Sequence, residues 1–570
     1  MGRDDPARQT AFVWGAVPVD GAPFFLHRLY GGIYIPNSLG APLQSGFAQG
    51  FSTFSTGLST YVYVNVEKWI IHVGRHKTTV KGNLRGIFAK FTKRPRRRGE
   101  TREVRVMSEL IAAISTPAVP SAIGVLRLSG PGAAECADKV FRAGSGRPLT
   151  QTPDRRLVYG SLLDREGHVI DQVLATVSRA PHSYTGEDTA ELQCHGAPVV
   201  LSLALEALYA AGARPARPGE FTQRAFLNGK LDLTQAEAVA DLLEAETPQA
   251  VRTAVGQLTG ALSRRVEGIY SGLVDLLAHF HAVLDYPDED IDPFRARELE
   301  AALETAERGL EELLATYDRG KFLTRGVPCA IVGLPNAGKS SLLNALLGYQ
   351  RAIVTDIPGT TRDTVEERCV VGGVLLRLID TAGLRDTDDP VERLGVERSR
   401  AALAEAQLAL VLMDGSDPGE DPDRLLAELA LWEEAAGRCP RVVLVLTKAD
   451  LPQGRDRGFS VHGEEAPPVV RLSARTGAGL EELGAAVARL FPQGSGGEAG
   501  AMLTNARQAQ AARAALAALR EAETGLLAGV TPDAVLTDVE GALEALAELT
   551  GRAVREDVVE RIFSRFCVGK

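Results

Sequence analysis

The sequence predicts a multidomain protein with a small α+β domain at residues 107–228, an α-helical region in two parts at 229–325 and 493–570, and an α/β P-loop domain of the Ras-like type at 326–492. Three observations support this prediction. Strand-like and helix-like segments mix in the first stretch, and helical periodicity fills the second and returns at the end of the chain. Between the two helical parts, strands alternate with helices around a glycine-rich loop. Insertion of the P-loop domain into one helical region is the simplest arrangement.

Composition favours a globular protein of the cytoplasm. The chain has 570 residues, enough for several domains, and its 45% hydrophobic and 24% charged residues are ordinary for a soluble protein. No apolar run approaches the length of a transmembrane helix, so no membrane partner is expected. The six cysteines are scattered without Cys-x-x-Cys pairs, which argues against a disulfide framework or a zinc site and suits a reducing compartment.

The net charge of −10 is distributed unevenly. Residues 1–106 hold 16 Lys+Arg and 6 Asp+Glu, a net of +10, and the remainder therefore carries 47 − 67 = −20. The global field of this main body repels nucleic acid, so any such partner must meet local basic patches.

Residues 1–106 differ from the rest, because they hold 14 of the 32 aromatic residues and a basic run at 93–98 without helical periodicity. An RNA-binding arm and a targeting segment are two interpretations. We expect instead that the native protein begins at Met107 and that this atypical extension lies outside the native fold.

The α+β domain is predicted from short apolar runs separated by turn residues. Strands are expected at 110–114, 123–128, 157–163, 172–177 and 189–194, with an amphipathic helix at 199–211. In the helical region, helices are expected at 233–246, 248–284, 293–317 and 503–550, and Pro287 breaks the pattern between two of them. A Gly/Ser-rich linker at 492–497 marks the boundary of the P-loop domain.

A phosphate-binding loop is predicted at Gly333-Leu334-Pro335-Asn336-Ala337-Gly338-Lys339-Ser340, with Ser341 opening the following helix. The loop follows an apolar run at 327–332 and precedes a helix-compatible run at 341–347, the setting that such a loop requires. Its glycines let backbone N–H groups converge on phosphate oxygens, Lys339 adds a positive charge, and the Ser340 hydroxyl can bind Mg²⁺. The chain is therefore predicted to bind a nucleoside triphosphate.

Two further segments complete the predicted phosphate site. Asp380-Thr381-Ala382-Gly383 follows the predicted strand 374–379, where the Asp can hold Mg²⁺ through water and the Gly383 N–H can contact the γ-phosphate. Thr360 and Thr361 lie between the loop helix and that strand, where a mobile switch loop is expected. The Thr361 hydroxyl can bind Mg²⁺ once the γ-phosphate is present.

Guanine recognition is predicted from Thr447-Lys448-Ala449-Asp450, which follows the predicted strand 442–446. A carboxylate there accepts both N1–H and the exocyclic amine of guanine, which adenine cannot match. Ser473-Ala474-Arg475 follows the predicted strand 469–472 and suits a backbone contact to guanine O6. The first position of the tetrapeptide is usually Asn. GTP is expected here, and the effect of Thr447 on affinity stays open.

The position after Asp-Thr-Ala-Gly is Leu384, where many small GTPases have a glutamine that orients water. Leucine cannot hydrogen-bond water, so either hydrolysis is poor or another side chain takes the role. Glu392, a short loop further on, is the candidate.

These residues resemble the MnmE (TrmE) family of GTPases, which act in tRNA wobble-uridine modification. The resemblance extends from about 107 to 570. Its most specific parts are 184–188 (Tyr-Thr-Gly-Glu-Asp), 218–222 (Pro-Gly-Glu-Phe-Thr), 224–232 and the terminal Phe566-Cys567-Val568-Gly569-Lys570. The chain departs from the family pattern at Thr447 and in the loop 117–122, where members are often richer in glycine.

The resemblance implies GTP hydrolysis stimulated by K⁺. Asn336 and main-chain oxygens near Thr355, Ile357 and Thr360 would bind the ion when two such domains meet in a homodimer. Glu392 would orient the attacking water through a bridging water, and Arg385 would support that loop.

The resemblance also implies that the α+β domain dimerises and binds 5-formyltetrahydrofolate through Arg127, Glu191, Lys230 and Lys570. Cys567 would be needed for modification but not for hydrolysis. The partner would be the flavoprotein MnmG, in a heterotetramer that modifies C5 of uridine 34. An Era-like RNA-binding assembly factor and a plain switch without an RNA role stay open as alternatives, and neither needs the folate motifs or the Cys567 tail.

Overall fold

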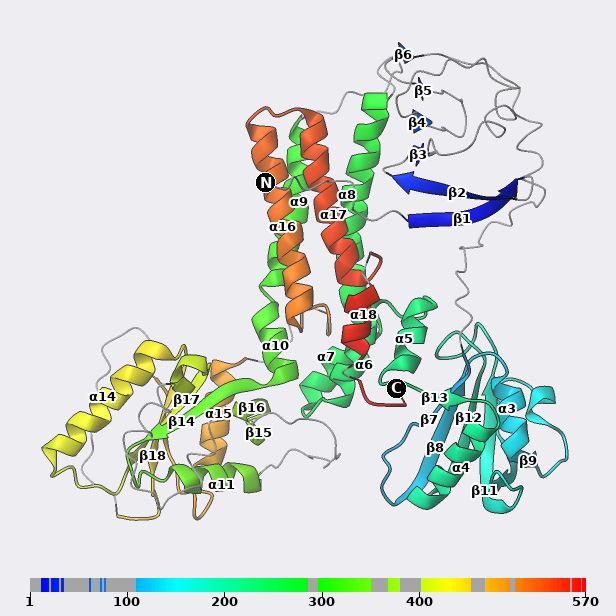
Figure 1. Cartoon of the computed structure of the whole chain (residues 1–570). Coiled ribbons are helices and arrows are strands. Elements are labelled where there is room, and N and C mark those ends of the chain that lie inside the picture. The colour runs from blue at the N-terminus through cyan, green and yellow to red at the C-terminus, as the bar shows by residue number, and fades with distance from the viewer. Residues whose placement is uncertain are drawn as a thin grey trace, which may run out of the picture. The chain divides into compact units, whose positions relative to one another are not determined.

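A computed structural model describes residues 109–285, 296–349, 367–379, 401–452, 467–492, 498–553, 556–564 and 566–569, together with short strands nearer the N-terminus (Figure 1). The chain divides into two compact units, Met1–Val106 and Met107–Lys570. In the first unit, β1 (Phe12–Val19), β2 (Ala22–Leu29), β3 (Gly32–Tyr34) and β4 (Tyr61–Val62) form an antiparallel sheet, and β5 (His72–Val73) pairs with β6 (His76–Lys77).

The α+β domain is built on a seven-stranded sheet in the order β13-β7-β8-β12-β11-β10-β9. The strands are β7 (Ile111–Ile114), β8 (Ser121–Ser129), β9 (Phe141–Ala143), β10 (Val158–Leu163), β11 (Val169–Ser178), β12 (Thr189–Gly196) and β13 (Arg214–Pro215). Neighbouring strands are antiparallel except for β13 and β7. Every strand predicted for this domain is present, whereas β9 and β13 were missed because they are too short to show an alternating pattern.

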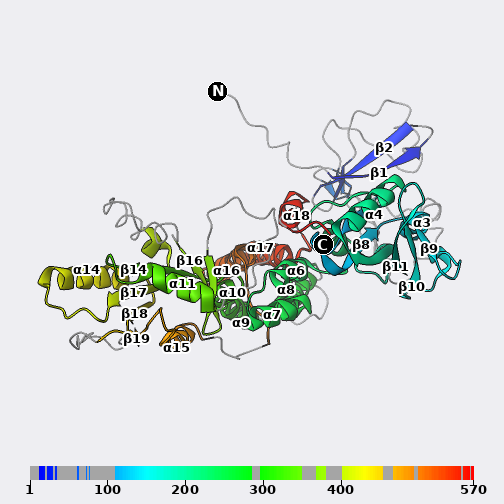
Figure 2. The ribbon, with the colours of Figure 1, turned by 90° about the horizontal axis from the view of Figure 1, so that it is seen from below.

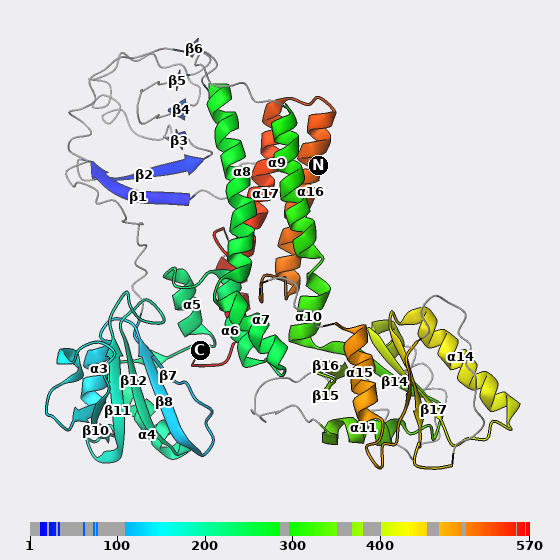
Figure 3. The same ribbon diagram turned by 180° about the vertical axis from the view of Figure 1, so that it is seen from behind.

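Two helices, α3 (Ala133–Val140) and α4 (Pro198–Ala210), cover one face of this sheet (Figure 3). Alternate residues of β8 and β12, such as Leu126, Leu128 and Leu192, are fully buried beneath them. On the opposite face, α5 (Glu220–Leu227) contributes Phe221, which packs on Ile111. Intervening strand residues therefore face away from the main core, and the predicted ligand-binding residues Arg127 and Glu191 are among them.

The helical region combines two stretches of chain into one apolar core. The first stretch provides α6 (Leu233–Leu243), α7 (Pro248–Leu258), α8 (Ala261–Asp285), α9 (Ala296–Leu314) and α10 (Tyr317–Arg325). The second provides α16 (Ala506–Leu527), α17 (Pro532–Thr550) and α18 (Glu556–Phe563). Fully buried leucines from α8, α9, α16 and α17 meet in this core. Figure 2 shows these helices from below. The P-loop domain therefore lies, in the sequence, between two stretches of chain that share one helical core.

The predicted single helix 248–284 is wrong, because the chain breaks it into α7 and α8 at Thr259 and Gly260. Gly260 has φ of +85°, a backbone conformation that residues with side chains rarely adopt. The expected helix 293–317 corresponds to α9, which ends at Leu314, and a separate helix, α10, begins at Tyr317. The expected helix 503–550 is divided by a turn around Gly529.

The segment that follows the P-loop domain in the sequence, around Met502 and Leu503, packs closely against these helices. A Cβ placed on Gly320 of α10 would lie only 2.0 Å from the carbonyl oxygen of Leu503, so the close approach requires glycine. Leu503 N donates to Thr316 Oγ1 at 3.1 Å, and Gln257 Nε2 donates to Met502 O at 2.7 Å. These bonds fix both connections of the inserted domain to one side of the helical region.

The P-loop domain has a six-stranded sheet in the order β15-β16-β14-β17-β18-β19. The strands are β14 (Val327–Gly333), β15 (Glu367–Val371), β16 (Val374–Leu378), β17 (Leu408–Asp414), β18 (Val442–Thr447) and β19 (Val469–Arg471). All pairs are parallel except β15–β16. Helices α11 (Lys339–Tyr349) and α15 (Leu480–Leu490) pack on one face and α14 (Pro422–Arg438) on the other, which confirms the doubly wound α/β prediction.

Strand β15 was not predicted, because it is a five-residue edge strand in which Cys369 and Val371 are its buried residues. In the part of the chain that the structure describes, no helix combines the length and apolar character needed to cross a membrane.

Candidate nucleotide-binding site

Residues 334–338 form the loop that joins β14 to α11, as predicted. Asn336 and Gly338 have φ of 63° and 94°, which turn the chain sharply between strand and helix. Lys339 Nζ donates to the carbonyl oxygens of Gly333 at 2.9 Å and Leu334 at 3.1 Å, and burial lowers the pKa of its ammonium. Because Ser340 follows in the first turn of α11, a lysine, a hydroxyl and the N–H groups of a helix N-terminus gather in one place, a suitable arrangement for phosphate.

The predicted base-recognition segment meets this loop in space. Thr447, at the end of β18, is buried, and its Oγ1 lies 2.8 Å from Ala337 O and 3.1 Å from Met413 O. Asp450 accepts a 2.7 Å hydrogen bond from the Ser473 hydroxyl, which lowers the pKa of the Asp450 carboxyl. The carboxylate is therefore ionised at neutral pH, and an ionised carboxylate can accept two hydrogen bonds, the number that the N1–H and amine of a guanine would donate.

One residue of this region was missed from the sequence. Asp414 ends β17, and its carboxylate lies 2.6 Å from Lys448 Nζ and accepts from both the backbone N and the hydroxyl of Ser416. Burial raises the pKa of the Asp414 carboxyl, but the bonds from Lys448 and Ser416 outweigh burial and lower it overall. The sequence signal that could have identified Asp414 is an acidic residue at the end of a continuous apolar run.

Several predicted site residues lie outside the described part of the chain. They are Thr355, Ile357, Thr360, Thr361, Asp380, Thr381, Ala382, Gly383, Arg385, Glu392 and Lys570. Ser341 and Ala474 are described, and they lie in α11 and directly after Ser473, respectively.

Two of the predicted folate-contacting residues, Arg127 and Glu191, contact each other. Arg127 and Glu191 are opposite each other on β8 and β12, with Nε 2.8 Å from Oε1. The Arg127 guanidinium also lies over the rings of Tyr184 and Phe221, with Cζ 5.7 and 5.8 Å from the ring centroids. Lys230 is exposed and lies beside Gly186 of the same loop as Tyr184. A cation, a carboxylate and an aromatic ring therefore share one area of the sheet.

Other residues of the recognised motifs are structural. Arg224 is buried and donates to Glu187 Oε2 at 2.8 Å and Glu220 Oε1 at 2.9 Å, while Glu187 also accepts from Ser129. Burial raises the pKa of Glu220, but hydrogen bonds from Arg214, the Arg217 backbone and Arg224 lower it to about 2. This network joins the loop 184–188 to α5. It therefore fixes the position of the loop that carries Tyr184, whose ring lies next to Arg127.

The C-terminal tail lies against the α+β domain. Gly219 N donates to Cys567 O at 3.3 Å, and the Ser115 hydroxyl donates to Gly569 O at 3.0 Å. Phe563 and Phe566 anchor the tail, with ring centroids 5.3 Å apart. The Cys567 side chain is exposed, whereas the other five cysteines of the chain are buried. The tail thus places one accessible thiol beside the motif 218–222.

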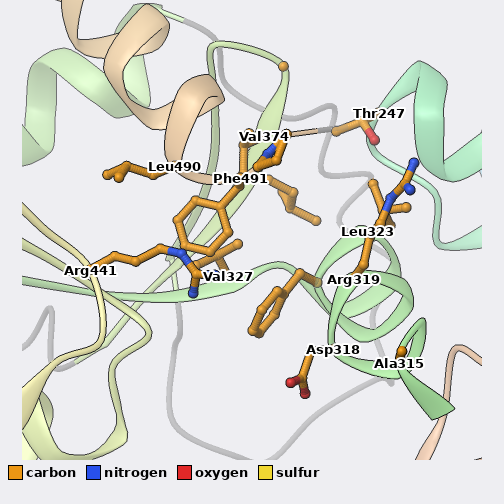
Figure 4. A pocket seen from close by; sticks show the side chains of 14 residues that line it. Thr247, Ala315, Asp318, Arg319, Leu323, Val327, Val374, Arg441, Leu490 and Phe491 are labelled. Atoms are coloured by element: carbon orange, nitrogen blue, oxygen red, sulfur yellow. The ribbon is translucent and has the colours of Figure 1, made fainter. Parts of the chain in front are cut away.

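A cavity of about 270 Å³ lies where the helical region meets the P-loop domain (Figure 4). Apolar side chains such as Phe322, Leu323 and Val374 line it, and the Arg441 guanidinium stacks on Phe491 with Cζ 4.6 Å from the ring centroid. None of its lining residues belongs to the nucleotide motifs, so we interpret it as a junction cavity and not as the nucleotide pocket.

The phosphate loop, the base-recognition segment and the doubly wound sheet together define a protein of the P-loop GTPase class. The family model described as the MnmE helical domain matches residues 233–567, and the model described as the GTP-binding protein TrmE N-terminus matches residues 110–230. The chain belongs to the MnmE family.

Individual relatives agree with this membership. A "tRNA modification GTPase MnmE" of Roseiflexus sp. (strain RS-1) is 44% identical over 473 residues, which cover 81% of this chain and 99% of the relative. The protein of the same name from Chloroflexus aurantiacus is 45% identical over 467 residues, covering 81% and 100%. Among solved structures, the G domain of the T. maritima FeoB iron transporter is 27% identical, with coverage of 29% of this chain and 97% of that chain and a TM-score of 0.20.

Proposed function

We propose that the chain is a GTP hydrolase of tRNA modification that acts with a flavoprotein partner on C5 of the wobble uridine, position 34, of certain tRNAs. The observation that carries the proposal is the hydrogen bond between Thr447 and Ala337, which joins a base-recognition segment to a phosphate loop in a member of the MnmE family. The names of the relatives supply tRNA as the substrate class.

The described residues can hold GTP in a defined orientation. The N-terminus of α11 and Lys339 face the phosphates with positive charge, and the Asp450 carboxylate accepts from N1–H and the amine of guanine. The Ser340 hydroxyl suits Mg²⁺, a hard ion that prefers oxygen, and Thr361 is the second ligand that we assign. Asp380, Thr381, Ala382 and Gly383 complete the phosphate site in this proposal. Bound Mg²⁺ would neutralise charge that develops on the phosphates.

For hydrolysis, we assign a K⁺ ion to Asn336 and to main-chain oxygens at Thr355, Ile357 and Thr360. Asn336 supplies an amide oxygen on the exposed side of the loop, at its left-handed turn. The ion would stabilise negative charge in the transition state when two P-loop domains meet in a homodimer. Glu392 orients the attacking water, and Arg385 supports its loop.

For the modification step, we assign 5-formyltetrahydrofolate to the area around Arg127. A pterin edge needs a carboxylate acceptor, which Glu191 offers, and an anionic glutamate tail needs cations, which Arg127, Lys230 and Lys570 offer. The Tyr184 ring beside Arg127 adds an aromatic surface. Cys567 is the reactive side chain that we assign to modification, because its thiol is exposed and its tail is bonded to Gly219 of the same domain. The flavoprotein partner is MnmG, and the site of action is the cytoplasm.

Nucleoside analysis of tRNA tests this proposal. In a bacterial strain that lacks its own family member, this chain should restore the modified uridine at position 34, and Lys339→Ala should not. Restored GTP hydrolysis with unmodified uridine would overturn the proposal in favour of an Era-like assembly factor.

The potassium assignment is tested by turnover of the purified protein. GTP hydrolysis should be faster in KCl than in NaCl of equal concentration by about an order of magnitude or more. The K⁺ ion would replace the positive charge of an arginine finger, which accelerates hydrolysis by about 10³-fold or more in other GTPases. Equal rates in the two salts would reject the ion site while leaving the tRNA proposal in place.

A further inference from the structure

One edge of the α+β domain is strongly basic. Residues 139–157 contain Lys139, Arg142, Arg147, Arg155 and Arg156 against the single acidic residue Asp154, a net of 5 − 1 = +4. Residues 107–570 as a whole carry −20. This short stretch is therefore a local basic patch of the kind that a polyanion needs on an acidic protein.

The four arginines lie on the edge strand β9, in the segment after it and in the segment that leads into β10. Strand β9 is the last strand in the sheet order, and Arg142 lies on it between the buried residues Phe141 and Ala143, directly opposite Ser161 of β10. Arg147 directly follows the turn after β9, which is closed by the hydrogen bond from Gly146 N to Ala143 O. Arg155 and Arg156 lie in the segment that leads into β10 and are separated from that strand by Leu157, and Arg155 N donates to Val177 O of the neighbouring strand β11 at 2.7 Å.

The charge of these arginines is left largely unneutralised. All four side chains are exposed, and none forms an ion pair with a carboxylate among the described residues. Asp154 forms its ion pair with Arg179 at 2.5 Å and interacts with Arg155 only through the electrostatic field, and Asp138 accepts from the backbone N atoms of Leu149 and Thr150. The edge therefore keeps its positive charge.

An exposed aromatic ring lies within the same edge. Tyr159 of β10 is 62% exposed, and Leu174, its cross-strand neighbour on β11, is 38% exposed. On the other side of Tyr159 lies Gly144, whose N–H donates to Tyr159 O and which has no side chain to cover the ring. Arginines next to an accessible aromatic ring are the combination that binds single-stranded nucleic acid, because guanidinium groups contact phosphates and the ring stacks on a base.

We propose that this edge, formed by Arg142, Arg147, Arg155, Arg156 and Tyr159, is an RNA-docking surface that takes a single-stranded loop of the tRNA substrate. The inference rests on the proposed function for the identity of the RNA. We choose RNA as the partner because these arginines are positively charged on an otherwise acidic protein, and RNA is a polyanion. The Tyr159 ring can in addition stack on an unpaired base.

Fluorescence anisotropy with labelled, unmodified tRNA tests the surface in the full-length protein. The variant Arg142→Ala/Arg147→Ala/Arg156→Ala should bind at least about tenfold more weakly at low salt. Its slope of log affinity against log salt should fall by about 2 to 3, because each lost phosphate contact removes 0.7 to 0.9. The control Arg252→Ala/Arg308→Ala/Arg489→Ala removes three exposed arginines elsewhere and should leave both quantities nearly unchanged.

The aromatic part of the proposal has its own test. Tyr159→Ala should weaken binding roughly fivefold to a hundredfold, the range for loss of one stacked base, and Tyr159→Phe should restore it without changing the salt slope. Equal tRNA affinity of the arginine variant and its control would overturn the surface, as would a change of oligomeric state in place of a change in affinity. The proposed function would survive either outcome, because it fails only if the wild-type chain leaves uridine 34 unmodified.

Discussion

At the scale of single residues, the structure shows what Thr447 does at the position of the base-recognition segment where Asn is usual. The Thr447 hydroxyl donates to Ala337 O of the phosphate loop. The base-recognition segment and the phosphate loop are therefore hydrogen-bonded to each other even though threonine is smaller than asparagine. In our proposal the guanine-selective group is Asp450, whose carboxyl pKa is lowered by the hydrogen bond from Ser473.

Asp450→Asn should change the nucleotide preference from GTP to XTP. An amide donates one hydrogen bond and accepts one, which matches the C2 carbonyl and N1–H of xanthine, whereas the carboxylate matches the two donors of guanine. Competition binding with GTP, XTP and ATP measures the change. A variant that still prefers GTP would show that Asp450 does not read the base, and Arg475→Ala serves as a neighbouring control.

A second residue-scale prediction concerns Asp241 of α6. Burial raises the pKa of its carboxyl to about 6, although the Thr504 hydroxyl lies 3.1 Å away. The folded state thus holds a proton that the unfolded chain loses near its ordinary pKa of 3.8. Stability from this group is therefore lost as pH rises from about 4 to 6, by on the order of 2–3 kcal/mol.

Asp241→Asn should remove this pH dependence, because the amide keeps an acceptor for Thr504 and never ionises. In thermal melts the variant should be more stable than wild type above pH 6, and the difference should shrink towards pH 4. Asp275→Asn, an exposed position on α8, should show no such trend. A constant difference across the whole pH range would contradict the assignment.

At the scale of elements, the β15–β16 hairpin connects the nucleotide site to the helical region. The segments that hold Thr361 and Asp380 adjoin its two ends in the sequence. Arg368 on β15 donates to Glu246 at 2.9 Å, and the next residue, Thr247, accepts from Ala250 N and caps α7. A shift of the hairpin with the state of the nucleotide would thus reach the start of α7.

Arg368→Ala should separate GTP turnover from modification. The ion pair is partly exposed and contributes less than about 1 kcal/mol to stability, so folding and nucleotide affinity should be nearly unchanged. Modified uridine should fall more than turnover does, because the link to the helical region is cut. The control Arg377→Ala removes a pair with Glu405 inside the P-loop domain. Equal modification by wild type and Arg368→Ala would refute this role.

The elements were predictable where the sequence pattern is local and strong. The apolar runs of β14, β17 and β18 and the motifs at their ends identified the doubly wound domain, since buried parallel strands and the loops after them have a distinct signature. The break at Gly260 and the edge strand β15 were missed, because the first depends on one backbone angle and the second on pairing with β16.

The residues of the candidate site were predictable where they belong to one continuous motif, as with the strands. Asn336, Lys339 and Ser340 follow from one contiguous motif. The ion pair of Asp414 with Lys448, by contrast, joins residues 34 positions apart, and the Arg224 network joins α5 to a loop 37 positions earlier. Such contacts are set by tertiary packing, which one sequence does not display.

At the scale of the whole molecule, the residues of the proposed GTP site and those of the proposed modification site lie in different domains. Nucleotide motifs lie in the P-loop domain, whereas the exposed thiol of Cys567 and the pair Arg127–Glu191 lie with the α+β domain. The helical region provides both the connections of the inserted domain and the helix α18 that leads to the tail. We therefore expect GTP hydrolysis and base modification to respond differently to changes at the tail.

Replacement of Cys567 by serine tests the central claim most directly, with GTP turnover and uridine 34 modification measured for the same variant. Cys567→Ser keeps the tail contacts of its backbone and removes only the thiol. The account predicts turnover equal to wild type and loss of the modified nucleoside, with Cys439→Ser in the P-loop domain as a control that keeps the modification. Full modification by Cys567→Ser would contradict the account.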